Sequence, residues 1–173
     1  PSMLVTHPSL PVRNLGELVA LAKARPGTLT YGSAGSGAPT SHLGVELLKI
    51  TAGIDMVHVP YKSMSPALID LLGGQIHLAI PTIISTVPHV RSGRLRAIGV
   101  TSLQRSPAVP DVPPLAEQGM PGYEANNWYA IVGPAGLPGP VVTRVHADAA
   151  KVLQASDLQE RMTSLGMEAR SMP

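Results

Sequence analysis

Short apolar segments alternate with helix-like segments from Leu29 to Val100, and this alternation constrains the fold more than any other feature of the chain. The expected strands span residues 29–31, 56–59, 76–80 and 95–100. Helices are expected between them, over about 40–52, over 65–72 and in the stretch ending at Val90. Such alternation is typical of a parallel sheet, because right-handed crossovers place helices on both faces. We therefore predict an α/β fold with a mostly parallel sheet flanked by helices, whose strand-to-helix loops leave at one edge.

The residues before this alternation add one strand and one helix. Met3–Thr6 is a short apolar strand candidate. Asn14 followed by Glu17 forms a capping box, which is typical of a helix start. The expected inward face of this first helix comprises Leu15, Leu18, Val19 and Ala22. In the helix over 40–52 the expected inward residues are Leu43, Leu47 and Leu48, and Ser65-Pro66 is expected to cap the next helix.

The chain changes character after Ser102. A proline-rich connection over 105–114 leads to a short helix at 115–118. Tyr123–Val132 is expected to be a strand that leaves the repeat, and two further helices are expected over 141–153 and about 157–165. These helices do not continue the alternation. We therefore expect them to belong to another lobe or to pack across the first.

A loop of small residues, from Tyr31 to His42, runs out of an expected strand into an expected helix. Its glycines let backbone N–H groups approach a ligand closely, and the free N–H groups of the next helix carry partial positive charge. The loop therefore suits a carboxylate or a phosphate. The same residues also suit an ordinary strand-to-helix turn in which the glycines serve backbone geometry alone.

Two further loops are expected at the same edge of the sheet, which is where open α/β sheets bind ligands. The donors that the three loops offer are Ser36, Gly37, Thr40 and Ser41, then Tyr61 and Lys62, then Thr82 and Ser85. None of these loops carries an acidic side chain, which suits a small anionic or strongly polar solute. The alternative is that the hydroxyls cap helices, and for Ser65 and Thr40 this alternative is favoured.

Composition excludes several classes of function. A formal charge of +2 with 14% charged residues is too weak for nucleic-acid binding. With no cysteine, the chain has no disulfide, no thiol nucleophile and no thiolate metal ligand. Its apolar runs are too short for a transmembrane helix. The chain opens on Pro1-Ser2 without a signal peptide, so any targeting segment is expected to have been removed or to lie outside these residues.

Common catalytic motifs are also absent from the sequence. After Gly37 the P-loop pattern requires Lys and then Ser or Thr, but Ala38 and Pro39 follow. The loop also lacks the third glycine of a dinucleotide-binding loop. No serine has glycines two residues before and after it, as a hydrolase elbow requires. The six histidines show no metal-ligand spacing, so neither a metal nor a cofactor is expected. His58 and His77 are expected within strands, hydrogen-bonded rather than catalytic.

A set of ordered motifs resembles one family along nearly the whole chain. The motifs are Pro8-Ser9-Leu10-Pro11-Val12, Ala24-Arg25-Pro26-Gly27, Tyr31-Gly32-Ser33, Ser41-His42-Leu43, Val57-His58-Val59-Pro60-Tyr61-Lys62, Leu71-Leu72-Gly73-Gly74-Gln75, Gly93-Arg94-Leu95-Arg96, Thr101-Ser102, Arg105-Ser106-Pro107, Pro110-Asp111-Val112-Pro113 and Gly119-Met120-Pro121-Gly122-Tyr123-Glu124. Together they resemble the Bug proteins, the TctC-like extracytoplasmic solute receptors of tripartite tricarboxylate transporters.

The resemblance implies a lobe like those of type II periplasmic binding proteins, closing over a small organic acid that is passed to membrane subunits. Residues 7–124 would then be the second, ligand-binding lobe. Residues 1–6 and 125–173 would supply crossover strands and a remnant of the first lobe, including C-terminal helices of that partner lobe. The N-terminal part of the first lobe would be missing before Pro1. The resemblance also implies a periplasmic location.

The resemblance further implies which residues face the ligand. They are Ser33, Gly35, Ser36, Gly37, Ala38, Thr40, Ser41, His42, Tyr61, Lys62, Pro81 and Thr82. Two departures bear on specificity. Ser63-Met64 follows the Tyr-Lys pair where the family commonly has glycines, and Pro81-Thr82 stands where it often has Asp-Asn. Loss of a carboxylate in the third loop would suit a more anionic or a more apolar solute.

Three hypotheses of function follow. The first is a receptor that buries a mono- or dicarboxylate among backbone N–H groups and hydroxyls without chemistry. The second is an enzyme acting on a carboxylate, with His42 or His58 as base and Lys62 as electrostatic partner. The third is an interaction module, in which the fragment exposes apolar surface and self-associates through its terminal helices.

Overall fold

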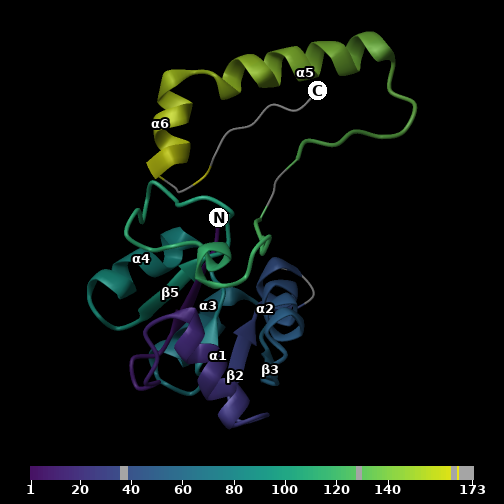
Figure 1. The fold of residues 1–173 in the computed structure, drawn as a ribbon. Coiled ribbons are helices and arrows are strands. Elements are labelled where there is room, and N and C mark those ends of the chain that lie inside the picture. The colour runs from purple at the N-terminus through teal and green to yellow at the C-terminus, as the bar shows by residue number, and fades with distance from the viewer. Residues whose placement is uncertain (36–38, 128–129, 165–166, 168–173) are drawn as a thin grey trace. The chain divides into compact units, whose positions relative to one another are not determined.

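A computed structural model describes residues 1–35, 39–127, 130–164 and 167 (Figure 1). The chain divides into two compact units, Pro1–Asn127 and Trp128–Pro173. The elements of the first unit are β1 (Met3–Thr6), α1 (Leu15–Ala24), β2 (Thr30–Ser33), α2 (Pro39–Ala52), β3 (Val57–Pro60), α3 (Met64–Leu72), β4 (Leu78–Ala79), α4 (Ile83–Arg91), β5 (Arg96–Val100) and the 3-10 helix η2 (Leu115–Gln118). The second unit contains α5 (Gly139–Leu153) and α6 (Ser156–Ser164).

The strands of the first unit form one sheet in the order β3-β2-β4-β1-β5. Strand β2 runs parallel to both β3 and β4, whereas β1 runs antiparallel to β4 and β5. Because β1 is reversed relative to both of its neighbours, β5 points the same way as β2, β3 and β4. The predicted α/β fold with a mostly parallel sheet is therefore confirmed. The reversed strand β1, which lies between β4 and the edge strand β5, was not predicted.

Helices cover both faces of this sheet, and a separate apolar cluster lies on each. Side chains of α1, α2 and η2 pack on one face, where Leu18, Leu48 and Leu115 are buried. Side chains of α3 and α4 pack on the other, around Leu71 and Ile83. The alternation of β1 joins the two clusters, because Leu4 belongs to the first cluster while Met3 and Val5 belong to the second.

The start of α1 confirms the predicted capping box. The Asn14 side chain accepts the Glu17 N–H at 2.9 Å and donates to Glu17 Oε1 at 3.0 Å, while Glu17 Oε2 accepts the Arg13 N–H at 2.7 Å. The first of these bonds satisfies a backbone donor that the first turn of a helix leaves unpaired, and the last satisfies the N–H of the residue before the cap. Leu15, Leu18 and Ala22 are buried, as expected.

Three sequence predictions about local structure were wrong. Helix α2 buries Leu48 as expected, but it also buries Val45, whereas the expected Leu43 and Leu47 are 59% and 39% exposed. Helix α3 begins at Met64 with Ser63 as its cap residue, two residues before the expected Ser65. The described residues of 123–132 form no strand; residues 128–129 lie outside the described part of the chain.

The second unit consists mainly of two helices. Within α5 no residue is buried, although the helix carries exposed Val141, Val142, Val145 and Val152. Arg144 and Asp148 form an ion pair along it at 2.7 Å. Over the described residues of both units, no helix combines the length and the apolar character needed to cross a membrane.

Candidate functional site

Three loops leave the sheet at one edge, as the alternation predicted. Strands β3, β2 and β4 are adjacent and parallel, and their last residues are in register: Ser33 pairs with Pro60, and Gly32 with Ala79. The loops after β2, β3 and β4 therefore emerge side by side. Near the third loop, Thr82 forms a bridge with Ser2, which precedes the reversed strand β1.

The loop after β2 begins with a tight turn built by its own hydroxyls. The Ala34 N–H donates to Ser41 Oγ at 3.1 Å, and the Gly35 N–H donates to Ser33 Oγ at 3.3 Å. Gly35 has φ +64°, and a Cβ added there would lie 3.0 Å from the Tyr61 carbonyl oxygen. Glycine is required at this position because both its conformation and its close approach to the second loop exclude a side chain.

The second and third loops hold their polar groups in local contacts. The Tyr61 hydroxyl donates to Asp70 Oδ2 at 2.7 Å, and burial together with this carboxylate raises the pKa of Tyr61 to about 12. The Thr82 carbonyl accepts the Ser85 hydroxyl at 2.9 Å and the Thr86 hydroxyl at 3.0 Å. Both loops are thus stiffened by bonds to the helices that follow them.

The predicted ligand-facing residues fall into three groups. Ser33, Ser41 and Pro81 are buried. Gly35, Thr40, His42, Tyr61 and Thr82 are partly exposed, and Lys62 is exposed. Ser36, Gly37 and Ala38 lie outside the described residues. The hydroxyls of Ser33 and Ser41 each accept a hydrogen bond from a backbone N–H of the loop, and these two bonds shape the turn. Ligand contact by any of these residues stays a prediction.

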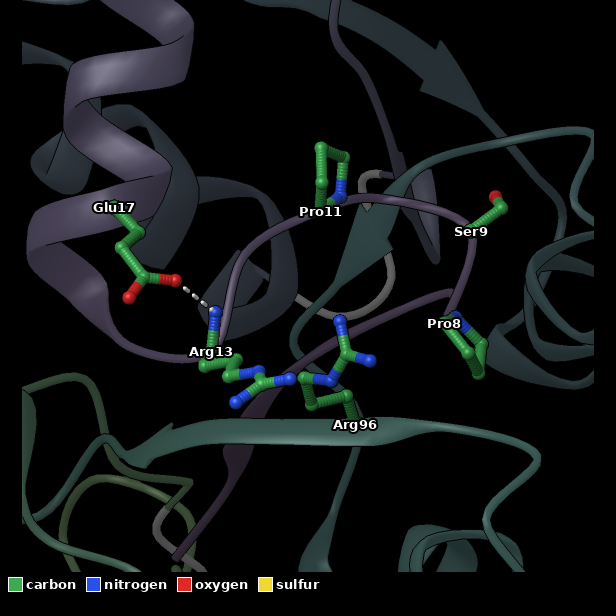
Figure 2. A pocket seen from close by; sticks show the side chains of 6 residues that line it. All are labelled: Pro8, Ser9, Pro11, Arg13, Glu17 and Arg96. Atoms are coloured by element: carbon green, nitrogen blue, oxygen red, sulfur yellow. Dashed lines mark hydrogen bonds between the residues drawn. The ribbon is translucent and has the colours of Figure 1, made fainter.

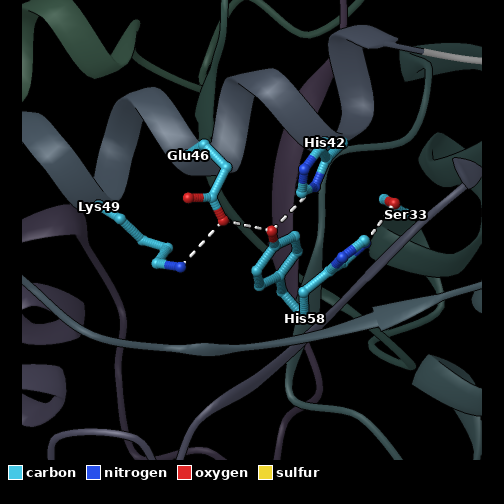
Figure 3. A network of polar contacts seen from close by, with 6 residues as sticks. Ser33, His42, Glu46, Lys49 and His58 are labelled. Atoms are coloured by element: carbon cyan, nitrogen blue, oxygen red, sulfur yellow. Dashed lines mark hydrogen bonds and ion pairs between the residues drawn. The ribbon is translucent and has the colours of Figure 1, made fainter. Parts of the chain in front are cut away.

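A polar network that sequence reasoning missed lies between α2 and the strands β2 and β3 (Figure 3). The Tyr31 hydroxyl donates to Glu46 Oε1 at 2.5 Å and contacts His42 Nδ1 at 2.9 Å. Lys49 Nζ lies 2.9 Å from the same Glu46 oxygen. His58 Nε2 lies 2.7 Å from Ser33 Oγ. The network thus reaches from α2 to the first turn of the loop after β2.

The rings in this network are stacked. His42 and His58 have centroids 4.2 Å apart, and Tyr31 and His58 have centroids 4.9 Å apart. The register of β2 against β3 makes this possible, because Tyr31 pairs directly with His58. One sequence signal was available: His42 and Glu46 are four residues apart, so they share a helix face.

Burial and neighbouring charges shift the pKa values in the network. Burial and the Glu46 carboxylate raise the pKa of Tyr31. Burial alone would raise the pKa of Glu46, but hydrogen bonds from Tyr31 and Lys49 outweigh it and lower that pKa. Burial, followed by the charge of His42, lowers the pKa of His58. The arrangement therefore favours an ionised Glu46 and a neutral His58.

The remaining histidine expectations were partly confirmed. His58 lies in β3 and is hydrogen-bonded, as expected. His77 is also hydrogen-bonded, accepting the Thr30 N–H at 3.0 Å on Nδ1, but it directly precedes β4 rather than lying within a strand. Among the residues described, no group of three or more His, Cys, Asp or Glu side chains is arranged to hold a metal ion.

An open hollow of about 520 Å³ lies at the end of the sheet opposite the three loops (Figure 2). Its lining residues are Pro8, Ser9, Pro11, Arg13, Glu17 and Arg96. Arg96 begins β5 opposite Thr6, the last residue of β1, so the hollow is at the end of the sheet away from the three loops. Arg96 Nη1 donates to the Leu10 and Val12 carbonyls at 2.9 and 2.8 Å, which fixes the connection after β1.

Comparison with known proteins connects this architecture to a family. The family profile described as the tripartite tricarboxylate transporter family receptor, TctC, matches residues 1–173. The chain belongs to this receptor family. The resemblance to Bug and TctC-like receptors that the motifs indicated is thereby confirmed, and the family description supports the receptor hypothesis over the enzyme hypothesis.

Two curated relatives of the chain are about twice as long as the chain. A protein of the tcbD-tcbE intergenic region of Pseudomonas sp. is 38% identical over 169 residues, covering 97% of this chain and 50% of the relative. BugT of Bordetella pertussis is 34% identical over 166 residues, covering 96% and 51%. The chain therefore spans about half the length of the curated relatives it matches.

Solved structures of similar receptors share the fold. An R. palustris protein solved with adipate has a TM-score of 0.85 at 34% identity, covering 97% of this chain and 56% of the other. The periplasmic binding protein BugD has a TM-score of 0.81 at 34% identity, covering 96% and 56%. MatC from Rhodopseudomonas palustris, solved with bound malate, has a TM-score of 0.81 at 31% identity with the same coverage.

Proposed function

We propose that this chain is part of an extracytoplasmic receptor that captures a small organic carboxylate by closure around it, without making or breaking a bond. The observation that carries the proposal is the alignment of three loops at one sheet edge, set by the parallel pairing of β3, β2 and β4. These loops offer N–H and O–H donors and no carboxylate of their own. Such an edge suits an anion held by backbone dipoles.

The first turn of α2 is central to this proposal. Thr40 and His42 are partly exposed there, and the free N–H groups of a helix start carry partial positive charge. Tyr61 and Thr82 from the neighbouring loops are partly exposed as well. We expect a carboxylate to sit across these loops, with its remaining groups contacted by the other lobe when the receptor closes.

Similar receptors support the ligand class. One was solved with adipate and another with malate, and both ligands are dicarboxylates. We therefore expect a mono- or dicarboxylate as the ligand, delivery to the membrane subunits of a tripartite transporter, and a periplasmic location. In this proposal residues 7–124 are the second lobe, while residues 1–6 and 125–173 are the crossover segments and a remnant of the first.

Titration calorimetry against adipate, malate, a monocarboxylate and an aromatic carboxylate tests the proposal. We expect one class to bind and to be recovered chemically unchanged after prolonged incubation. Thr40→Val should weaken the binding, because it removes a donor at the start of α2, whereas Arg13→Ala, at the opposite edge of the sheet, should leave it unchanged. Conversion of a ligand, or loss of binding in Arg13→Ala alone, would contradict the proposal.

A further inference from the structure

The Tyr61 side chain is directed toward α3 and away from the open edge of the sheet. Its hydroxyl donates to Asp70 Oδ2 at 2.7 Å. Asp70 lies in the last turn of α3, whereas the first turn of that helix adjoins the loop after β3. The ring packs against the buried cluster that includes Leu71. The hydroxyl of Tyr61 is therefore bonded within the protein, although the sequence predicted it as a donor to a ligand.

A glycine of β2 leaves the space in which the Tyr61 ring lies. A Cβ added at Gly32 would be 3.3 Å from Tyr61 Cε2 and 3.3 Å from the Cβ of Ala67 in α3. A glycine within a strand often marks such a close approach. The ring is thus held between β2 and α3 by packing, and its far end is held by the Asp70 carboxylate.

The backbone of Tyr61 contacts the first turn of the loop after β2. Its N–H donates to the Ser33 carbonyl oxygen at 2.9 Å. Its own carbonyl oxygen lies 3.0 Å from the position of a Cβ added at Gly35. The Gly35 N–H in turn donates to Ser33 Oγ at 3.3 Å. A displacement of Tyr61 would therefore move both the last residue of β2 and the glycine of the turn.

The bond to Asp70 is a main attachment of the loop after β3. Lys62 and Ser63 of this loop are exposed, and Ser63 makes no side-chain hydrogen bond as the cap residue of α3. A hydrogen bond to a charged acceptor such as the Asp70 carboxylate is stronger than one between neutral groups. Burial and this carboxylate raise the pKa of Tyr61 to about 12, so the hydroxyl keeps its hydrogen at neutral pH.

We propose that Asp70 is a positioning residue of the binding edge, which holds the loop after β3 against the turn at Gly35 through the Tyr61 hydroxyl. Asp70 does not contact the ligand. It fixes, before binding, a loop arrangement that the ligand would otherwise have to order, and a loop ordered in advance costs less affinity. This inference rests on the proposed carboxylate receptor function. It assigns Tyr61 a role through its backbone instead of its hydroxyl.

Titration calorimetry with adipate and with malate tests the role of this bond. Tyr61→Phe removes the donor and Asp70→Ala the acceptor, so each should weaken binding about threefold to tenfold. The double variant should lose no more than either single variant, because all three lack the same bond. Asp70→Asn keeps an oxygen that accepts the hydroxyl and should restore part of the affinity. Thr28→Val removes a hydroxyl bond to the Arg25 carbonyl before β2, at the opposite end of that strand, and should bind like the unaltered chain.

Amide hydrogen exchange in the free chain separates positioning from a loss of overall stability. The Tyr61 N–H, bonded to Ser33, reports on the loop, while the Val57 N–H at the start of β3, bonded to the Leu29 carbonyl at 2.8 Å, reports on the sheet. We expect Asp70→Ala to speed exchange at Tyr61 and to leave it nearly unchanged at Val57. Ultraviolet titration gives a spectroscopic signature: in Asp70→Ala, Tyr61 should ionise at a lower pH than in the unaltered chain.

The outcomes distinguish this inference from the function on which it rests. Unchanged affinity in Tyr61→Phe and Asp70→Ala overturns the role of Asp70 and leaves the receptor proposal intact. Losses that add in the double variant do the same, because the hydroxyl then acts independently of Asp70. Equally faster exchange at Tyr61 and Val57 in Asp70→Ala also overturns it, since the bond is then merely structural. Failure of adipate and malate to bind the unaltered chain overturns the inference as stated, and failure of the other carboxylates as well overturns the receptor proposal.

Discussion

The two compact units of this chain use similar amphipathic helices in different ways. Helix α1 of the first unit buries Leu15, Leu18 and Ala22 against the sheet. Helix α5 of the second unit buries no residue, and its valines, among them Val145, are exposed. An amphipathic sequence therefore specifies a helix in both units, but only the first unit supplies the surface that its apolar face requires.

Polar contacts differ between the units in the same way. In the first unit, the hydroxyl of the buried Tyr31 is shared with His42 and with the Glu46–Lys49 pair. In the second unit, the Arg144–Asp148 pair has side chains that are 80% and 59% exposed. The first arrangement is partly shielded from water, with Lys49 and Glu46 side chains that are 19% and 31% exposed, whereas the second competes more fully with solvent.

The largest effect that separates the units is expected from a core substitution. Leu18→Ala removes a fully buried side chain from α1 and should lower the free energy of unfolding by about 2–5 kcal/mol. Val145→Ala in α5, where the side chain is 49% exposed, should change it by about 0.5 kcal/mol or less. Urea denaturation followed by far-ultraviolet circular dichroism measures both.

A Val145→Ala variant that loses as much stability as Leu18→Ala would remove the contrast between the units. It would show that the apolar face of α5 is covered in solution, as expected if the chain self-associates. The same measurement at two protein concentrations distinguishes self-association, because the stability of an associated form depends on concentration.

The sequence predicted the order of the elements in the first unit better than the faces that they bury. Apolar residues lie on two sides of α2, with Leu43 and Leu47 on one and Val45 and Leu48 on the other. Periodicity alone does not predict which of these sides is buried, because that depends on where α2 packs on the sheet. The reversed direction of β1 was equally hidden, because β1 lies outside the strand-helix alternation of residues 29–100 from which the parallel direction was inferred.

The candidate site shows the same limit. Parallel pairing of successive strands was enough to predict loops at one edge. The network was not predictable, because it depends on the register that places Tyr31 beside His58, and those residues are far apart in sequence. Burial of Ser33 was hidden for a related reason: a loop hydroxyl looks the same in the sequence whether it faces a ligand or its own turn.

An intermediate effect is expected when the network loses its central hydroxyl. Tyr31→Phe leaves the Glu46 carboxylate and the His42 N–H without their shared partner, and should lower the free energy of unfolding by about 1–3 kcal/mol. Asp148→Ala, which breaks the exposed pair of α5, should cost about 0.5 kcal/mol or less. Equal costs in the two variants, measured by urea denaturation, would contradict the contrast between shielded and exposed polar contacts.

The smallest effect expected is a pH dependence of the free energy of unfolding, caused by histidines of the first unit. Because burial lowers the pKa of His58 in the folded chain, the unfolded chain binds more protons just below pH 6.5. The stability that the fold gains by keeping the His58 ring neutral is therefore complete above pH 6.5. It is lost as pH falls through the pKa of His58 in the folded chain. His77 adds a change of the same sign, since burial lowers its pKa too.

Unfolding measured from pH 8 to pH 5 should show this decline, and His58→Gln should reduce it without removing the His77 part. Glu46 affects stability in a lower pH range. Because its pKa is also lowered, its contribution to the free energy of unfolding is complete above its ordinary pKa, near 4.5, and declines below that pH. A decline between pH 6.5 and pH 5 that is unchanged in His58→Gln would mean that the stacked ring is not held neutral by the fold.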